Sequence, residues 1–191
     1  MNLILASASP RRKELLNKIT DYFLCIPADI DETVPENEKT ENAPEYLSLK
    51  KAEFIAESYP DSIVLGSDTG VFCDGVMLGK PCDRDDAVRM LKMLSGRTHS
   101  VITGCALVKG DKKVSFSCET KVTFYELSDM EIENYVSTGE CDDKAGAYGI
   151  QGLGGTLVKS IKGDYYAIVG LPYAETVRVL SEFGIRGKIS F

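Results

Sequence analysis

Near the start of the chain a serine and two arginines, Ser7, Arg11 and Arg12, are spaced closely enough to bind one anion. The apolar run before Ser7 is typical of a buried strand, and Ser9 and Pro10 are favoured at the N-cap and first position of a helix. Arginines in the first turn of a helix oppose its macrodipole unless an anion lies between them. Backbone N–H groups, a hydroxyl and two guanidinium groups at the end of a strand therefore predict a phosphate site, and a solvated helix start is the alternative.

Carboxylates and a lysine that could complete such a site follow in the next segments. An acidic loop at residues 29–32 ends in Glu32. It is either a solvated loop or, beside a triphosphate, a source of oxygen ligands for a divalent metal. The spacing of apolar residues predicts a helix over residues 42–59, which Pro60 stops. Lys51 lies within this helix, where a lysine normally faces solvent.

An aspartate follows the next apolar run. Residues 63–66 predict a buried strand that ends at residues 67–69 and so places Asp68 at its carboxyl end. Open α/β sheets hold their chemistry at such strand ends, although an aspartate there is also a common turn residue. A hairpin with its turn at residues 74–75 is expected to bring Lys80 back toward the same edge. The sequence therefore predicts a carboxylate and an ammonium group at one site.

The remaining segments are predicted to form the scaffold. Helices are expected at residues 85–94, 129–138 and 172–183, long strands at 99–108 and 114–125, and a pair of short strands at 157–161 and 165–169. His99 is the single histidine and is expected to make a structural hydrogen bond, so a triad or metal site built on several histidines is excluded. The glycine-rich loop at residues 139–152, which contains Gln151, is expected to approach a ligand through its backbone.

Length, charge and cysteine content exclude several classes of protein. A length of 191 residues favours one domain, or one domain with two lobes. The net charge of −7 and the isoelectric point near 4.9 argue against a protein that binds nucleic-acid backbone. Six cysteines without C-x-x-C pairs are expected to be free thiols in a reducing cytoplasm. No signal peptide or membrane span is expected, since no apolar run approaches the roughly 20 residues that a span needs.

Together these residue types predict metal-assisted hydrolysis of a phosphoanhydride bond. The cations would bind a polyphosphate, and the carboxylates Asp68 and Glu32 would serve a metal and a base. No serine or cysteine is placed with the adjacent base that covalent catalysis needs, and the sequence has no P-loop string G-x-x-x-x-G-K-[ST]. The candidate cations are Arg11, Arg12, Lys51 and Lys80.

Three separated strings of the sequence are specific enough to compare with a family. They are LASASPRR at residues 5–12, the segment 65–81 with its Asp-Thr pair and Leu-Gly-Lys-Pro, and DKAGAYGIQG at residues 143–152. In this order they resemble the signatures of the Maf (septum-formation-inhibitor-like) family of nucleoside triphosphate pyrophosphatases. The resemblance implies a single domain over residues 1–191. The implied fold is α/β and Maf/ITPase-like, with a mixed, curved sheet flanked by helices and two lobes around a central cleft.

The resemblance also implies a reaction and roles for individual residues. Water would attack the α-phosphorus of a nucleoside triphosphate and release the monophosphate and pyrophosphate. Asp68 would accept the proton of this water or bind the metal that activates it, and Lys51, Lys80 and Glu32 would complete the catalytic group. The cofactor would be Mg²⁺ or Mn²⁺, held by Glu32 and Asp68. The implied substrate-binding residues are Ser7, Arg11, Arg12, Thr69 and Gln151.

Three of these positions, Arg11, Thr69 and Gln151, resemble the branch of the family that hydrolyses dTTP and UTP, with modified pyrimidine triphosphates as further candidates. An amide and a hydroxyl suit the carbonyls and imide N–H of a pyrimidine. The alternatives are a pyrophosphatase for 7-methyl-GTP, whose branch has tryptophan and two acidic residues at these positions, and a nucleotide-binding regulator of septum formation with little turnover. The expected partner is the nucleotide, without nucleic acid or membrane. Family members of this size are often homodimers, although the sequence marks no interface.

Overall fold

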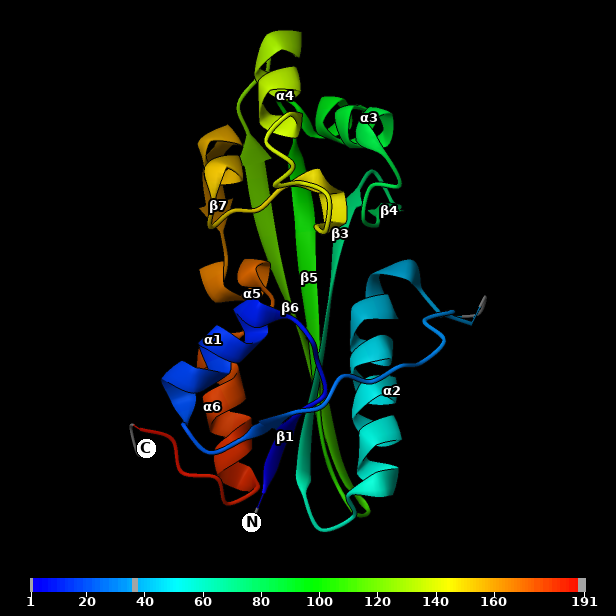
Figure 1. Ribbon diagram of the computed structural model, residues 1–191, viewed down its shortest axis with the longest axis vertical. Coiled ribbons are helices and arrows are strands. Elements are labelled where there is room, and N and C mark those ends of the chain that lie inside the picture. The colour runs from blue at the N-terminus through cyan, green and yellow to red at the C-terminus, as the bar shows by residue number, and fades with distance from the viewer. Residues whose placement is uncertain (1, 36–37, 189–191) are drawn as a thin grey trace. The chain divides into compact units, whose positions relative to one another are not determined.

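Three long strands form the middle of the sheet, namely β3 (Ile63–Cys73), β5 (Thr98–Lys109) and β6 (Lys112–Phe124). The structure is a computed structural model and describes residues 2–35 and 38–188 (Figure 1). Within these residues seven strands form one sheet in the order β2-β1-β3-β5-β6-β7, and β4 pairs with β3.

The sheet contains both parallel and antiparallel strand pairs. β1 (Leu3–Leu5) is parallel to β2 (Leu24–Cys25) and also to β3. β4 (Val76–Leu78) is antiparallel to β3, and β7 (Val158–Lys162) is antiparallel to β6. The predicted α/β fold, with a mixed sheet flanked by helices, is therefore confirmed.

The chain divides into two compact units. Unit 1 comprises the residues up to Asp68, residues 103–118 and the residues from Gly170 onward, and unit 2 comprises residues 69–102 and 119–169. Each of the three long strands therefore contributes one part to unit 1 and the other part to unit 2. The predicted single domain, with a cleft between two lobes, stays a prediction.

In unit 1, helices lie on both faces of the sheet. α1 (Pro10–Ile19) and α6 (Tyr173–Glu182) lie side by side on one face, and α2 (Ala43–Ser58), preceded by η1 (Thr40–Asn42), lies on the other (Figure 1). Every residue of β1 is buried, as expected for a parallel strand covered on both faces. The apolar core between α2 and the strands consists of Ile4, Ala6, Ala52, Ile55, Val64, Ala106 and Val108.

Among the residues that the structure describes, unit 2 contains five helical elements, and the first two of them begin at side-chain caps. They are α3 (Arg84–Leu94), α4 (Asp129–Val136), η2 (Ala145–Ala147), η3 (Leu153–Leu157) and α5 (Tyr165–Val169). The Asp83 side chain accepts a hydrogen bond from the Asp86 N–H at 2.8 Å and begins α3. Ser128 and Glu131 form a capping box at the start of α4. None of the helices in the described part of the chain is long and apolar enough to cross a membrane.

The structure corrects the predicted end of the strand that carries Asp68. The pattern at residues 63–66 predicts a strand that stops at residues 67–69, but β3 continues through them. Ser67 stays in the strand because its buried hydroxyl donates a hydrogen bond to the Gly170 carbonyl, 2.9 Å away. Polar residues after an apolar run usually indicate a turn, whereas here the partner of Ser67 lies far along the sequence. Asp68 therefore lies in the middle of a strand and not at its end.

A second correction concerns residues 165–169, for which the pattern predicts a strand paired with residues 157–161. This prediction is wrong, because β7 pairs with β6 and residues 165–169 form α5. The Asp164 side chain accepts a hydrogen bond from the Tyr166 N–H at 2.8 Å, an arrangement that caps the start of a helix. Two tyrosines and two β-branched residues give the segment β propensity, and the cap and the packing override it.

His99 occupies a buried structural position, as predicted. Its Nε2 shares a hydrogen bond of 2.9 Å with the Tyr148 hydroxyl, and its ring packs edge-on against Phe124 and Tyr148. Burial lowers the pKa of His99 to about 4, so the ring is neutral at pH 7. All six cysteines are free thiols, also as predicted.

Candidate active site

Lys51 of α2 contacts two carboxylates. Its Nζ lies 2.6 Å from Asp68 Oδ1 and 2.7 Å from Glu32 Oε1. The side chains of Lys51 and Asp68 are 11% and 14% exposed, whereas that of Glu32 is 59% exposed. The structure thus brings together three residues that the sequence assigns to one site, and it shows that Lys51 is not a solvated helix lysine.

Close packing of α2 on β3 places Lys51 at Asp68. A Cβ added to Gly66 would lie 2.0 Å from the Ser48 carbonyl oxygen, so only glycine permits this approach. Gly66 and Asp68 are two residues apart in a strand and face the same side. Ser48 and Lys51 are three residues apart in a helix and share a face. The contact at Gly66 therefore carries Lys51 directly over Asp68.

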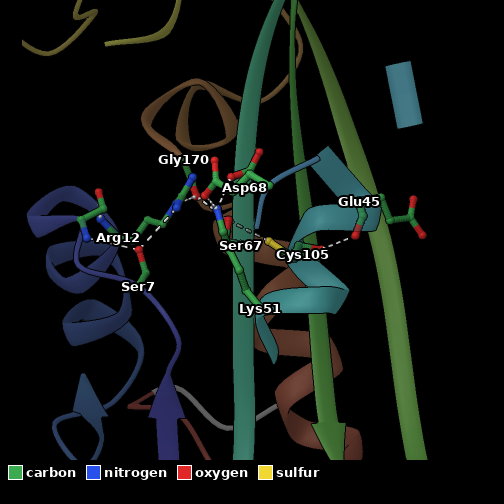
Figure 2. Close-up of polar contacts among 11 residues, drawn as sticks. Ser7, Arg12, Glu45, Lys51, Ser67, Asp68, Cys105 and Gly170 are labelled. Atoms are coloured by element: carbon green, nitrogen blue, oxygen red, sulfur yellow. Dashed lines mark hydrogen bonds and ion pairs between the residues drawn. The ribbon is translucent and has the colours of Figure 1, made fainter. Parts of the chain in front are cut away.

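Arg12 reaches the same region from α1. Ser9 begins this helix as predicted, since its hydroxyl accepts a hydrogen bond from the Arg12 N–H at 3.5 Å. The guanidinium group donates from Nη1 to Ser7 Oγ at 3.3 Å and from Nε to the Gly170 carbonyl at 3.0 Å. Figure 2 shows Arg12 and Lys51 extending from α1 and α2 toward Asp68 on β3. Two fixed contacts thus hold the orientation of the Arg12 fork.

Burial shifts the pKa values of two side chains in this region, Arg12 and Cys105. Burial lowers the pKa of Arg12, and the nearby charge of Asp68 acts in the opposite direction. Burial also raises the pKa of the Cys105 thiol to about 12. The thiol lies 3.5 Å from Ser67 Oγ, to which it donates. Cys105 is therefore a protonated packing residue, and it is not activated as a nucleophile.

Glu32 and Asp68 offer the oxygen atoms that a divalent metal would require. Both carboxylates converge on the one ammonium group of Lys51, so their oxygen atoms lie close together. Magnesium in phosphate-handling sites is usually held by one or two carboxylates together with phosphate oxygens and waters. Within the described residues no group of three His, Cys, Asp or Glu side chains is arranged to bind a metal. The two carboxylates therefore fit a metal that is shared with a bound phosphate.

The other predicted site residues belong to different segments. Arg11 is half-buried beside Arg12 in the first turn of α1. In unit 2, Thr69 is half-buried in β3, Lys80 is exposed just after β4, and Gln151 is exposed in the glycine-rich loop. The predicted approach of these unit 2 residues to Asp68 stays a prediction.

Known proteins resemble this chain over almost its whole length. Residues 2–183 match the family described as Maf-like protein. The chain belongs to this family. A dTTP/UTP pyrophosphatase of Bacillus velezensis is 48% identical over 184 residues, which cover 96% of this Maf-like chain and 97% of the relative. A dTTP/UTP pyrophosphatase of Symbiobacterium thermophilum is 50% identical over 182 residues, 95% of this chain and 94% of the relative.

Among solved structures, a nucleoside-triphosphatase (dITP/XTP pyrophosphatase) from Mycobacterium abscessus aligns with this Maf-like chain at a TM-score of 0.42 and 19% identity. The alignment covers 66% of this chain and 76% of that structure.

Two residues that position the site of this Maf-like chain are not among the site residues predicted from the sequence. They are Ser67 and Gly170. Ser67 directly precedes Asp68, and its burial could not be inferred from a segment that resembles a turn. Gly170 acts through its carbonyl oxygen, a group that every residue type carries. Neither residue therefore leaves a clear signal in the sequence.

Proposed function

We propose that this chain is a nucleoside triphosphate pyrophosphatase that hydrolyses dTTP and UTP to the nucleoside monophosphate and pyrophosphate. The observation that carries the proposal is the contact of Lys51 with both Asp68 and Glu32, at 2.6 and 2.7 Å. Relatives that are 47–50% identical to this chain bear the name dTTP/UTP pyrophosphatase. Carboxylates next to cations, in a member of this family, support hydrolysis of a phosphoanhydride bond.

Asp68 is the residue we assign as the proton acceptor. In the proposed step, water forms a bond to the α-phosphorus, the bond from this phosphorus to the bridging oxygen breaks, and pyrophosphate leaves. The water proton passes to an Asp68 oxygen. Lys51 holds Oδ1 of this carboxylate in place at 2.6 Å, which fixes the direction of the group. Asp68 is therefore positioned by a partner from α2 before substrate arrives.

The cations are assigned to the polyphosphate. Arg12 and Ser7 are linked by a hydrogen bond of 3.3 Å near Asp68, and we assign them to phosphate oxygens together with Arg11 and Lys80. Negative charge grows on the leaving pyrophosphate in the transition state, so cations held in place contribute most there. Arg12 is suited to this because its fork is already fixed by protein contacts.

Glu32 and Asp68 would hold Mg²⁺ or Mn²⁺ together with phosphate oxygens. When bound, such an ion supplies positive charge to the phosphates and to the reacting water. Lys51 lies between the two carboxylates and keeps them together, which limits their mutual repulsion.

We assign recognition of the base to Arg11, Thr69 and Gln151. The Gln151 amide can both donate to and accept from the carbonyl and imide groups of thymine or uracil.

The proposal also covers the organisation and location of the protein. It comprises a single domain over residues 1–191 and a cytoplasmic location, and the six free thiols support this location. The nucleotide is the proposed partner. A homodimer, an expectation taken from the family, would be measured by light scattering.

The test is pyrophosphate release from dTTP, UTP, CTP, ATP, GTP and 7-methyl-GTP, each with Mg²⁺ or Mn²⁺. We expect turnover of dTTP and UTP that is lost in Asp68→Asn and kept in Asp61→Asn, since Asp61 is an exposed aspartate in the turn before β3. Full turnover by a folded Asp68→Asn protein would refute the proton-acceptor assignment. Preference for 7-methyl-GTP, or tight binding of dTTP without turnover, would replace the proposed function with one of its two alternatives.

A further inference from the structure

The carboxylate of Glu140 binds the segment 149–154, which contains Gln151. Its Oε1 accepts hydrogen bonds from the Tyr135 hydroxyl at 3.0 Å and from the Gly154 N–H at 2.9 Å. Its Oε2 accepts a hydrogen bond from the Leu153 N–H at 2.8 Å. All of these residues belong to unit 2. One side chain thus holds two consecutive backbone N–H groups, two and three residues after Gln151.

Tyr135 fixes the other side of the same loop. Its hydroxyl accepts a hydrogen bond from the Gly149 N–H at 3.1 Å while it donates to Glu140. The loop also approaches the carboxylate directly, since a Cβ added to Gly152 would lie 2.2 Å from Glu140 Oε2. Gln151 is therefore bracketed by contacts before and after it, although its own side chain is exposed.

The charge state of Glu140 matches this arrangement. Burial acts to raise its pKa, but hydrogen bonds from Gly154, Leu153 and Tyr135 outweigh burial and lower it. An ionised carboxylate accepts at both oxygens, which three donors require. Burial raises the pKa of Tyr135, so its hydroxyl keeps the proton that it donates. The network is thus fully matched in donors and acceptors around a segment rich in flexible glycines.

We propose that Glu140 is a positioning residue for base recognition, which orders the loop 149–154 so that Gln151 meets the pyrimidine in one conformation. The proposal rests on the proposed function, because it assigns Glu140 a part in the preference of that reaction for dTTP and UTP. A glycine-rich loop without this anchor would lose conformational freedom each time a nucleotide binds, which weakens binding. Glu140 removes that loss beforehand and gives Gln151 a fixed place.

Glu140→Gln tests the proposal with little change in size. The amide has one acceptor oxygen, and its NH₂ group would face N–H or O–H donors in the same position. We expect kcat/KM for dTTP and UTP to fall about tenfold, the scale of leaving one buried donor unpaired, mainly through KM. The preference for dTTP over ATP and GTP is expected to fall with it. Glu126→Gln, an exposed glutamate in the same unit, is the matched control and should keep both values.

A double-mutant cycle separates positioning from a general loss of stability. If Glu140 acts through Gln151, the change Glu140→Gln should have less than about a twofold effect on kcat/KM in a Gln151→Ala background. An equal tenfold loss in both backgrounds would overturn the proposal. Retention of the dTTP preference by a folded Glu140→Gln protein would overturn it as well.

Two further measurements keep this inference separate from the proposed function. If Glu140→Gln does not fold, Tyr135→Phe removes the hydroxyl that links Glu140 to Gly149 and should lower the preference for dTTP in the same direction. An unchanged preference there refutes the proposal. If the wild-type protein hydrolyses no triphosphate, the proposed function fails by itself. Amide hydrogen exchange then tests the hydrogen bonds to Glu140 without any substrate. Rapid exchange of the N–H groups of Leu153 and Gly154 would overturn the proposal.

Discussion

Ser67 and Arg12 donate to the same carbonyl oxygen, that of Gly170, at 2.9 and 3.0 Å (Figure 2). The two donors come from β3 and α1, and Gly170 precedes α6. One backbone group in the turn before α6 therefore joins β3 and α1 beside Asp68. Because successive strand residues face opposite sides, Ser67 points to Gly170 while Asp68 points to α2.

The first prediction concerns Ser67→Ala. The change removes a buried hydroxyl that donates to Gly170 and accepts from Cys105, so we expect the free energy of unfolding to fall by about 1–2 kcal/mol. Arg12 keeps its own bond to Gly170 but loses a neighbour that fixes this carbonyl, so KM for the triphosphate should rise. Urea unfolding and steady-state kinetics measure the two effects. Ser181→Ala, an exposed serine on α6, should change neither, and equal effects of the two variants would contradict the prediction.

The second prediction concerns Gly66→Ala. The added methyl group would lie 2.0 Å from the Ser48 carbonyl oxygen, so α2 must move away from β3. We expect a loss of about 1–3 kcal/mol in the free energy of unfolding, as for overpacking of a core. Activity measured where the variant is still folded should also fall, since the shift withdraws Lys51 from Asp68. Gly79→Ala has open space around the new methyl group and serves as the stability control. A Gly66→Ala protein as stable as this control would contradict the close packing.

The third prediction concerns Lys51→Met, which keeps the length of the side chain and removes its charge. Asp68 and Glu32 would then face each other without a cation, so the protein should lose about 1–3 kcal/mol of stability. We expect kcat/KM to fall at least about 100-fold, the scale of removing a fixed charge from a reacting site. Lys50→Met is the matched control, because Lys50 is the neighbouring lysine on α2 and donates to a backbone carbonyl, that of Asp31. Comparable losses in activity for the two variants would contradict the role of Lys51.

The same variant tests the pair of carboxylates as metal ligands. With Lys51 replaced by methionine, added Mg²⁺ should raise the melting temperature more than in the wild-type protein, since the ion can take the place of the ammonium group. The measurement needs no substrate and no turnover. A Lys51→Met protein whose melting temperature does not respond to Mg²⁺ or Mn²⁺ would speak against metal binding by Glu32 and Asp68.

Local signals in the sequence predicted much of the fold. Ser9 with Pro10 begins α1, and Ser128 with Glu131 begins α4, and each of these caps acts within three residues of itself. The failed prediction of a strand end at residues 67–69 depends on a distant partner. Ser67 belongs to a strand because of Gly170, more than a hundred residues away in the chain. A sequence pattern cannot contain such a contact, so it indicates a turn instead.

In the candidate site, too, the residue types could be predicted from the sequence, whereas burial and contacts between distant segments could not. The residue types of Ser7, Arg12, Lys51 and Asp68 predict a phosphate site, and the structure brings these residues of unit 1 into one region. Burial of Lys51 could not be predicted, because it follows from the approach of α2 at Gly66 and not from any property of the lysine. Likewise, Glu140 resembles any exposed glutamate until the backbone N–H groups around it are known.

The last prediction concerns the pH dependence of stability. Burial lowers the pKa of His99 from 6.5 to about 4, so the unfolded chain binds a proton at a pH where the folded protein does not. The stability that the neutral ring provides is therefore complete above pH 6.5 and is lost as the pH falls toward 4. The difference between the pKa values of the unfolded and folded states corresponds to about 3 kcal/mol of the free energy of unfolding, of which about 2 kcal/mol is lost by pH 5.

His99→Gln tests this, because glutamine can still form a hydrogen bond with the Tyr148 hydroxyl but does not titrate. The free energy of unfolding of both proteins is measured in urea at pH 7 and at pH 5. The fall from pH 7 to pH 5 should be about 2 kcal/mol larger for the wild-type protein than for the variant. His99 is the single histidine, so the carboxylates, which titrate in both proteins, cancel in the comparison. Equal decreases for the two proteins would mean that His99 is accessible to protons in the folded state, and the buried contact with Tyr148 would then be wrong.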